Sequence, residues 1–230
     1  RREMSDVVVE EFGREHATCY EILAAIAGGK RSQKEIADVV RLPPTSLPPY
    51  LRDLVDLLGV IEYRVPVTER GKRSKMGRYV FADNFFRFYA RYIYRNMSLY
   101  ESGRFDLLKN RILREWEGFS GRAFEEMLRS LLARDLTERY EEIGPWWNRR
   151  GDEIDLLALG PEGSLAVEIK NRDLTLPEAR GILAALEEKL PLVKGLGQPV
   201  TTGIAARTVE GKEVLRAGGF YVMDLDDLGI

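Results

Sequence analysis

Three charged residues lie in or directly after apolar runs of the kind that form buried strands, which ordinarily carry no charge. The runs are IDLLAL at residues 154–159 and SLAVEI at residues 164–169. Asp155 interrupts the first run, and Glu168 lies near the end of the second run. Lys170 is the first residue after the second run. Buried carboxylates and ammonium groups are costly unless they are paired or bound to a metal. These three charges are therefore either compensated or functional.

The tetrapeptide between the two runs predicts how the charges meet. Gly160-Pro161-Glu162-Gly163 is rich in turn-forming residues, so the segment predicts a β-hairpin. If Gly160 faces Gly163, the same register places Asp155 opposite Glu168, with Cβ atoms roughly 5 Å apart. Lys170 lies two residues beyond Glu168 and therefore on the same face of its strand.

Two carboxylates this close repel each other unless a cation lies between them. An oxygen-only ligand set favours Mg²⁺ or Mn²⁺ over zinc. Lys170 beside them is suited to orient a water molecule or to stabilise the charge on a phosphate. We interpret Asp155, Glu168 and Lys170 as a metal-dependent, phosphodiester-cleaving site. The alternative is a satisfied ion-pair network that only stabilises the hairpin.

Composition excludes several other kinds of site. The chain of 230 residues has one cysteine and one histidine, which excludes an internal disulfide, a cysteine-based zinc site and most histidine-based triads. No GxxxxGK[ST] loop is present, so ATP binding is not expected. No apolar run is long enough to span a membrane and no signal peptide opens the chain, which favours a cytoplasmic protein. The charged fraction of 31%, with few Asn and Gln residues, is typical of a thermophile.

The first part of the chain predicts a winged helix-turn-helix domain over residues 1–83. Helical patterns cover residues 15–27, 33–40 and 46–58, and Ser32 with Glu35 forms the sequence of a capping box. Strands are predicted at residues 60–67 and 78–82, with a polar loop between them. Three helices followed by a two-stranded wing are typical of this DNA-binding fold.

The wing is the part of this domain best suited to bind nucleic acid. A net charge of −2 gives no global attraction to DNA, so the binding must be local. The third helix exposes acidic residues and is a poor reader of base edges, which favours contacts to the phosphate backbone. The alternative is a winged helix that only docks on a neighbouring domain. The candidate phosphate ligands are Arg70, Lys72, Arg73, Lys75 and Arg78 in and beside the wing, and Arg149 and Arg150 before the hairpin.

Residues 84–110 are predicted to form aromatic-rich connecting helices, and residues 111–230 a second domain. One helix is expected near residues 105–117, and another at residues 118–136. The order that follows is strands, helix, strand, helix and strand, which indicates a mixed sheet with helices on both faces. The whole chain is thus predicted to be α/β in its second part and α+β overall.

The second domain resembles the PD-(D/E)XK, or restriction-endonuclease-like, superfamily. The matching residues are Glu125 in AFEEML, Asp155 in GDEIDLLAL, and Glu168 with Lys170 in VEIKN. The resemblance implies that Asp155 and Glu168 bind Mg²⁺ (or Mn²⁺), that Lys170 positions the attacking water, and that Glu125 supports the metal as a further catalytic and metal-binding residue. It also implies endonuclease activity on DNA, double-stranded or branched.

Most of the chain also resembles the C-terminal half of archaeal AAA-type ATPases, in which a P-loop ATPase precedes a winged helix and a nuclease-like domain of uncharacterised function. The segments that carry this likeness are EIAD, YLRDLVDLLGVIEYRVPV, RYVFADNFFRFY and GDEIDLLAL. It implies an ATPase domain in the same chain or in a partner chain, and the chain is expected to be the C-terminal part of a longer protein. A non-catalytic DNA-binding or protein-interaction module, and a homo-oligomer, are alternatives left open.

Overall fold

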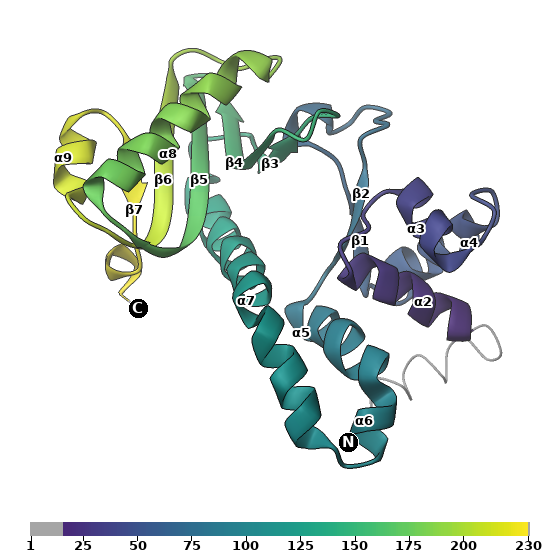
Figure 1. Cartoon of the computed structure of the whole chain (residues 1–230). Coiled ribbons are helices and arrows are strands. Elements are labelled where there is room, and N and C mark those ends of the chain that lie inside the picture. The colour runs from purple at the N-terminus through teal and green to yellow at the C-terminus, as the bar shows by residue number, and fades with distance from the viewer. Residues whose placement is uncertain (1–15, 230) are drawn as a thin grey trace. The chain divides into compact units, whose positions relative to one another are not determined.

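The computed structural model describes residues 16–229, which form two compact units (Figure 1). The first unit runs to Arg64 and resumes from Gly77 to Glu115. The second unit consists of Val65–Met76 and the chain from Trp116 onwards. The boundaries at residues 83 and 110 remain sequence-based predictions.

The first unit has the predicted order of three helices and a two-stranded hairpin. The helices are α2 (His16–Ala27), α3 (Gln33–Val40) and α4 (Leu47–Arg52), and α4 continues as a π-helical turn, η2 (Asp53–Leu57). Strands β1 (Ile61–Arg64) and β2 (Arg78–Phe81) pair antiparallel, with Ile61 opposite Phe81. The predicted capping box is confirmed, because the Ser32 hydroxyl accepts from the Glu35 backbone N–H while the Glu35 carboxylate accepts from the Ser32 N–H.

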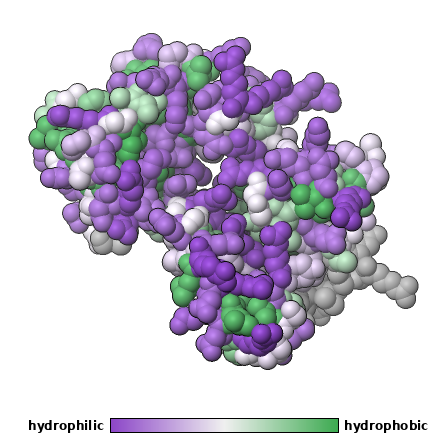
Figure 2. Space-filling view, viewed as in Figure 1, coloured by the Kyte–Doolittle hydropathy of each residue, from purple (hydrophilic) through white to green (hydrophobic). Residues whose placement is uncertain are grey.

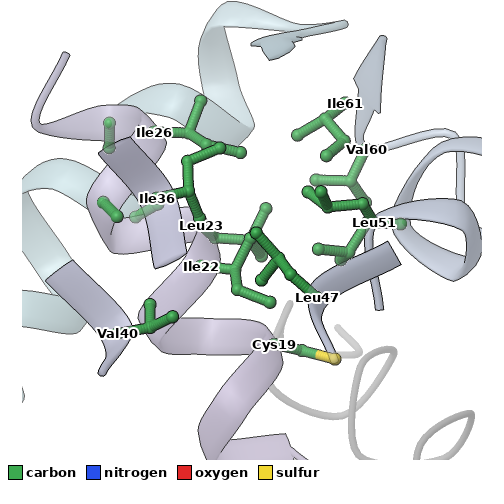
Figure 3. Close-up of a cluster of buried hydrophobic side chains, with 14 of the residues drawn as sticks. Cys19, Ile22, Leu23, Ile26, Ile36, Val40, Leu47, Leu51, Val60 and Ile61 are labelled. Carbon is green, nitrogen blue, oxygen red and sulfur yellow. The ribbon is translucent and has the colours of Figure 1, made fainter. Parts of the chain in front are cut away.

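One apolar cluster holds these elements together (Figure 3). Ile22 and Leu23 of α2 are fully buried and pack with Ile36 of α3. Leu47 and Leu51 bring α4 into the same cluster, and Ile61 adds the first strand of the hairpin. Helical spacing of apolar residues therefore folds this unit, as the sequence pattern predicts.

The helices after the hairpin differ from the prediction at Gly118. The aromatic-rich segment is a chain of short pieces: α5 (Asn84–Phe88), the π-helix η4 (Tyr89–Ile93), the 3₁₀-helix η5 (Tyr94–Asn96) and α6 (Met97–Glu101). The prediction of two helices meeting at Gly118 is wrong, because α7 (Phe105–Leu136) is one helix of 32 residues. A glycine inside a helix costs only about 1 kcal/mol, so the flanking helix-forming residues outweigh Gly118.

The second unit contains a five-stranded mixed sheet in the order β3-β4-β5-β6-β7, among the residues described. Strands β3, β4 and β5 are antiparallel neighbours, whereas β6 and β7 run parallel to β5. The strands are β3 (Glu142–Trp147), β4 (Glu153–Gly160), β5 (Gly163–Leu174), β6 (Val200–Val209) and β7 (Tyr221–Met223). Helix α8 (Leu176–Lys189) links β5 to β6, and α9 (Lys212–Ala217) links β6 to β7. Short 3₁₀ turns are η3 (Val67–Glu69), η6 (Leu190–Leu192) and η7 (Asp226–Leu228).

Helices cover both faces of this sheet, as predicted. Leu128 and Leu132 of α7 pack with Leu156 and Val167 on one face. On the other face, the apolar side of α8 packs against the alternate strand residues, including Ile204 and Ala206. Alternation of side chains along each strand explains why both faces are apolar. The α+β fold class is therefore confirmed.

Across residues 16–229, no helix combines the length and apolarity that a membrane crossing requires.

The loop between β1 and β2 belongs to the second unit. Val67 is 2% exposed and packs in one cluster with Trp146, Ile154 and Leu157. At the other end of the loop, the Trp147 Nε1–H donates a 2.8 Å hydrogen bond to the Met76 carbonyl. The loop is therefore anchored along β3 at both of its ends.

Candidate active site

The β4–β5 hairpin adopts the predicted register. Gly160 pairs with Gly163, and Leu156 pairs with Val167, which leaves Asp155 beside Glu168. The Asp155 Oδ2 accepts a 2.8 Å hydrogen bond from the backbone N–H of Ile169. The pairing of β4 with β5 is therefore enough to place the two carboxylates next to each other.

Lys170 lies between the two carboxylates. Its Nζ donates to Glu168 Oε2 at 2.9 Å and is 3.5 Å from Asp155 Oδ2. The side chains of Lys170, Asp155 and Glu168 are 32%, 19% and 8% exposed. The cluster is therefore partly open to solvent at Lys170 and closed around Glu168.

Lys189 is a further member of the cluster that the sequence pattern did not reveal. Its Nζ donates to Glu168 Oε1 at 2.6 Å and to the Glu153 carbonyl at 2.9 Å. Lys189 is the last residue of α8, where a cation also suits the helix dipole. A lysine at the end of a predicted helix is the only feature of the sequence that points to Lys189. This feature does not indicate which carboxylate the lysine side chain contacts.

Helix α7 supplies two charged residues, Arg129 and Glu125, that interact with the hairpin. The Arg129 Nε donates to the backbone carbonyl of Asp155 at 2.7 Å. Glu125 lies one helical turn earlier and so shares that face of α7. Burial raises the pKa of the Glu125 carboxyl, and the positive charges of Lys170, Arg129 and Arg122 oppose that rise. Glu125 is thus electrostatically coupled to the cluster.

The two hairpin carboxyls titrate in opposite directions. Burial, and then the charge of Glu168, raise the pKa of Asp155 to about 7, although Lys170 acts against this rise. Burial also acts to raise the pKa of Glu168, but Lys170 and hydrogen bonds from Asp155 and Lys189 hold that pKa below its usual value. Burial acts to lower the pKa of Lys170, but the carboxylates of Asp155 and Glu168 raise it overall. Near pH 7 the Asp155 carboxyl is therefore partly protonated, whereas Glu168 is ionised, and a bound cation would favour the ionised form of both.

The oxygen donors of Asp155 and Glu168 fit a hard divalent cation. Mg²⁺ is commonly held by one or two carboxylates while it keeps several waters. Over residues 16–229, no three His, Cys, Asp or Glu side chains are arranged to hold a metal, so Glu125 does not complete a three-carboxylate set. A cation at this position would displace Lys170 from between the two carboxylates.

The predicted nucleic-acid ligands fall into two groups. Arg78 is on β2 in the first unit and faces Arg64 across the hairpin. The others lie in the second unit, where Arg70 forms a 3.4 Å ion pair with Glu142 and Lys72 donates to the Thr68 carbonyl. The exposed members are Arg70, Lys72, Arg73 and Lys75 in the loop and Arg149 and Arg150 in the β3–β4 turn.

The chain is similar to one protein family and to one archaeal protein. The DUF234 family, described as archaea bacterial proteins of unknown function, matches residues 89–182. The chain is 35% identical over 234 aligned residues to uncharacterized protein MJECL04 of Methanocaldococcus jannaschii. This alignment covers 99% of the chain and 51% of the relative, so the chain spans about half the length of that protein.

Among solved structures, the chain is similar to protein VC1899 from Vibrio cholerae, at 14% identity and a TM-score of 0.34. The match covers 96% of this chain and 49% of the other. At that TM-score it carries no argument about fold or function.

Proposed function

We propose that the Asp155–Glu168–Lys170 cluster is a divalent-cation-dependent site that hydrolyses phosphodiester bonds in DNA. The observation that carries the proposal is the convergence of two carboxylates and a lysine from adjacent antiparallel strands, with the pKa of Asp155 raised to about 7. Perturbed carboxyl groups of this kind are concentrated at functional sites. The hairpin, the mixed sheet and the helices on both of its faces support membership of the PD-(D/E)XK superfamily.

Each residue of the cluster has a role in this proposal. Asp155 and Glu168 hold Mg²⁺ or Mn²⁺, while Glu125 supports the site from α7. When bound to these carboxylates, the metal would supply Lewis-acid stabilisation of the phosphate. Lys170, released from the carboxylates, orients the attacking water and offsets the negative charge that develops on the phosphate.

The basic residues of the wing loop and the β3–β4 turn supply contacts to the DNA backbone in this proposal. An ATPase domain, in the same chain or in a partner, is the proposed source of any energy-dependent step, because the resemblance to archaeal ATPases includes such a domain. A double-stranded or branched substrate and a cytoplasmic location complete the proposal.

Cleavage assays test it directly. The full chain is incubated with supercoiled plasmid, branched duplex and single-stranded DNA in the presence of Mg²⁺ or Mn²⁺. We expect cleavage that requires the metal and is abolished in Asp155→Ala and Lys170→Ala. Glu188→Gln, which changes an exposed carboxylate of α8, is the matched control and should cleave as the wild type does. Cleavage that persists in both site variants would overturn the proposal.

A second candidate is a non-catalytic module with the same fold. The observation that favours it is that both oxygens of Glu168 already accept hydrogen bonds from lysines, which makes a satisfied ion-pair network. Such a module binds DNA with a strong salt dependence but does not cleave it with any metal. If it binds no DNA even at low salt, a protein-interaction role for the ATPase is the remaining alternative.

A further inference from the structure

The loop between β1 and β2 and the turn between β3 and β4 are joined in the second unit. The Trp147 side chain donates to the Met76 carbonyl at 2.8 Å, and Met76 directly follows Lys75. Trp147 itself lies two residues before Arg149, at the start of the turn. Figure 1 draws the loop beside β3, consistent with the packing of Val67 against Trp146.

This junction gathers cations that no neighbouring group neutralises. Lys72, Arg73 and Lys75 of the loop are exposed, as are Arg149 and Arg150 of the turn. Within residues 16–229, the side chains of Arg73, Lys75, Arg149 and Arg150 make no hydrogen bond or ion pair, and Lys72 contacts only a backbone carbonyl. Hydrophilic residues also predominate on the face drawn in Figure 2, with apolar residues only in small patches.

We infer that these five side chains form one composite surface of the second unit that binds the sugar-phosphate backbone of a nucleic acid. The inference rests on the proposed function for its substrate class and adds that the loop and the turn act as one surface, coupled through the hydrogen bond between Trp147 and Met76. Five unpaired cations on two joined loops complement a chain of phosphates, each of which carries one charge. The wing therefore acts as part of the sheet unit, and Arg70, paired with Glu142, is not a member of this surface.

The surface is close to the carboxylates along the chain. Arg150 and Asp155 are five residues apart, so their Cα atoms are separated by at most about 18 Å. A duplex rises about 3.4 Å per base pair, so this distance corresponds to at most about five base pairs along the duplex axis.

Binding measured without metal tests this surface separately from cleavage. Fluorescence anisotropy of a labelled duplex is followed with the full chain in EDTA over a range of salt concentrations. We expect Lys72→Ala/Arg73→Ala/Lys75→Ala and Arg149→Ala/Arg150→Ala each to weaken binding at least tenfold. Each variant should also lower the salt slope by about 0.9 for every phosphate that it no longer neutralises. Because EDTA removes the metal, this measurement reports binding whether or not the wild type cleaves DNA.

A variant that keeps every charge tests whether the two loops act together. Trp147→Phe removes the hydrogen bond to Met76 and retains an aromatic ring, so it should weaken binding several-fold in the wild-type background. It should have no effect once the loop cations are removed, because the coupling is then absent. Far-UV circular dichroism shows whether Trp147→Phe is folded. If it is not, the charge variants of the loop and the turn still test the surface.

The control is Arg180→Ala/Lys194→Ala, which removes two exposed cations of the same unit outside these loops. The inference is overturned if the wild type binds no duplex at low salt, if this control weakens binding as much as the loop variants do, or if either loop variant binds DNA as the wild type does. It is also overturned if the weakening appears only with vesicles of anionic phospholipid, which would assign the surface to a membrane.

Discussion

Asp155 is the residue whose surroundings least suit its charge. Burial and the charge of Glu168 raise its pKa to about 7, and Lys170 only partly offsets them. The other charges packed around it are Glu125 and Arg129 on α7, and Lys189 on α8 through Glu168. Ionisation of Asp155 therefore destabilises the folded state relative to the form in which this carboxyl is protonated.

Asp155→Asn should reveal this cost as a function of pH. The ordinary pKa of an aspartate is near 3.8 and the folded-state pKa is about 7, so the folded chain binds more protons than the unfolded chain between these values. Stability of the wild type therefore falls as pH rises through that window and levels off above it. The stability of Asp155→Asn relative to the wild type should increase from pH 5 to pH 7 and change little from pH 7 to pH 8.

Urea unfolding followed by tryptophan fluorescence is a suitable measurement. Trp116, Trp146 and Trp147 are the three tryptophans of the chain, and all belong to the second unit. Glu188→Gln, at an exposed position, should show no such trend. A stability difference for Asp155→Asn that is constant from pH 5 to pH 8 would contradict the raised pKa.

Lys189→Met tests the lysine that the sequence pattern missed. The change removes hydrogen bonds to Glu168 and to the Glu153 carbonyl, so we expect a decrease of about 1–2 kcal/mol in the free energy of unfolding of the second unit. The decrease should be smaller in a Glu168→Gln background, because less charge is left without a partner. Lys194→Met, at an exposed residue, should change stability by less than about 0.5 kcal/mol. Equal decreases in the two backgrounds would show that Lys189 does not act through Glu168.

At the level of elements, the hairpin could be predicted and its supporting contacts could not. Two apolar runs and a glycine-rich turn fix a local register, so the sequence is enough to place Asp155 and Glu168 side by side. Lys189 reaches Glu168 across 21 residues from the end of a helix, and periodicity carries no information on such a contact. The packing of the loop at Val67 against β3 could not be predicted either, because only tertiary contacts determine which unit buries the loop.

Gly163 tests how strictly the hairpin turn is determined. Its φ is +137°, and an added Cβ would lie 2.4 Å from the Pro199 carbonyl oxygen. Gly163→Ala should therefore destabilise the second unit by about 2–5 kcal/mol through backbone strain and overlap. Gly151 also has a positive φ, +98°, but an added Cβ would meet nothing within 4 Å. Gly151→Ala should thus cost only about 1 kcal/mol. Similar costs for the two variants in urea unfolding would contradict the crowding at Gly163.

At the level of the whole molecule, one of the two compact units carries most of the residues of the proposed function. The first unit has the helices and hairpin of a winged helix, while the basic loop that would form its wing packs with the second unit. The carboxylate cluster and all of the candidate phosphate ligands except Arg78 therefore lie in one unit. This arrangement predicts that contacts to the DNA backbone and the cleavage site act on the same stretch of substrate.

Binding of Mn²⁺ is the measurement that tests the central claim most directly, because it requires neither a substrate nor turnover. Electron paramagnetic resonance of the full chain at pH 8 should show Mn²⁺ bound by the wild type and by Glu188→Gln. Binding should be abolished in both Asp155→Asn and Glu168→Gln, which each remove one of the two carboxylates. Absence of binding by the wild type, or undiminished binding in both site variants, would contradict a metal site between Asp155 and Glu168.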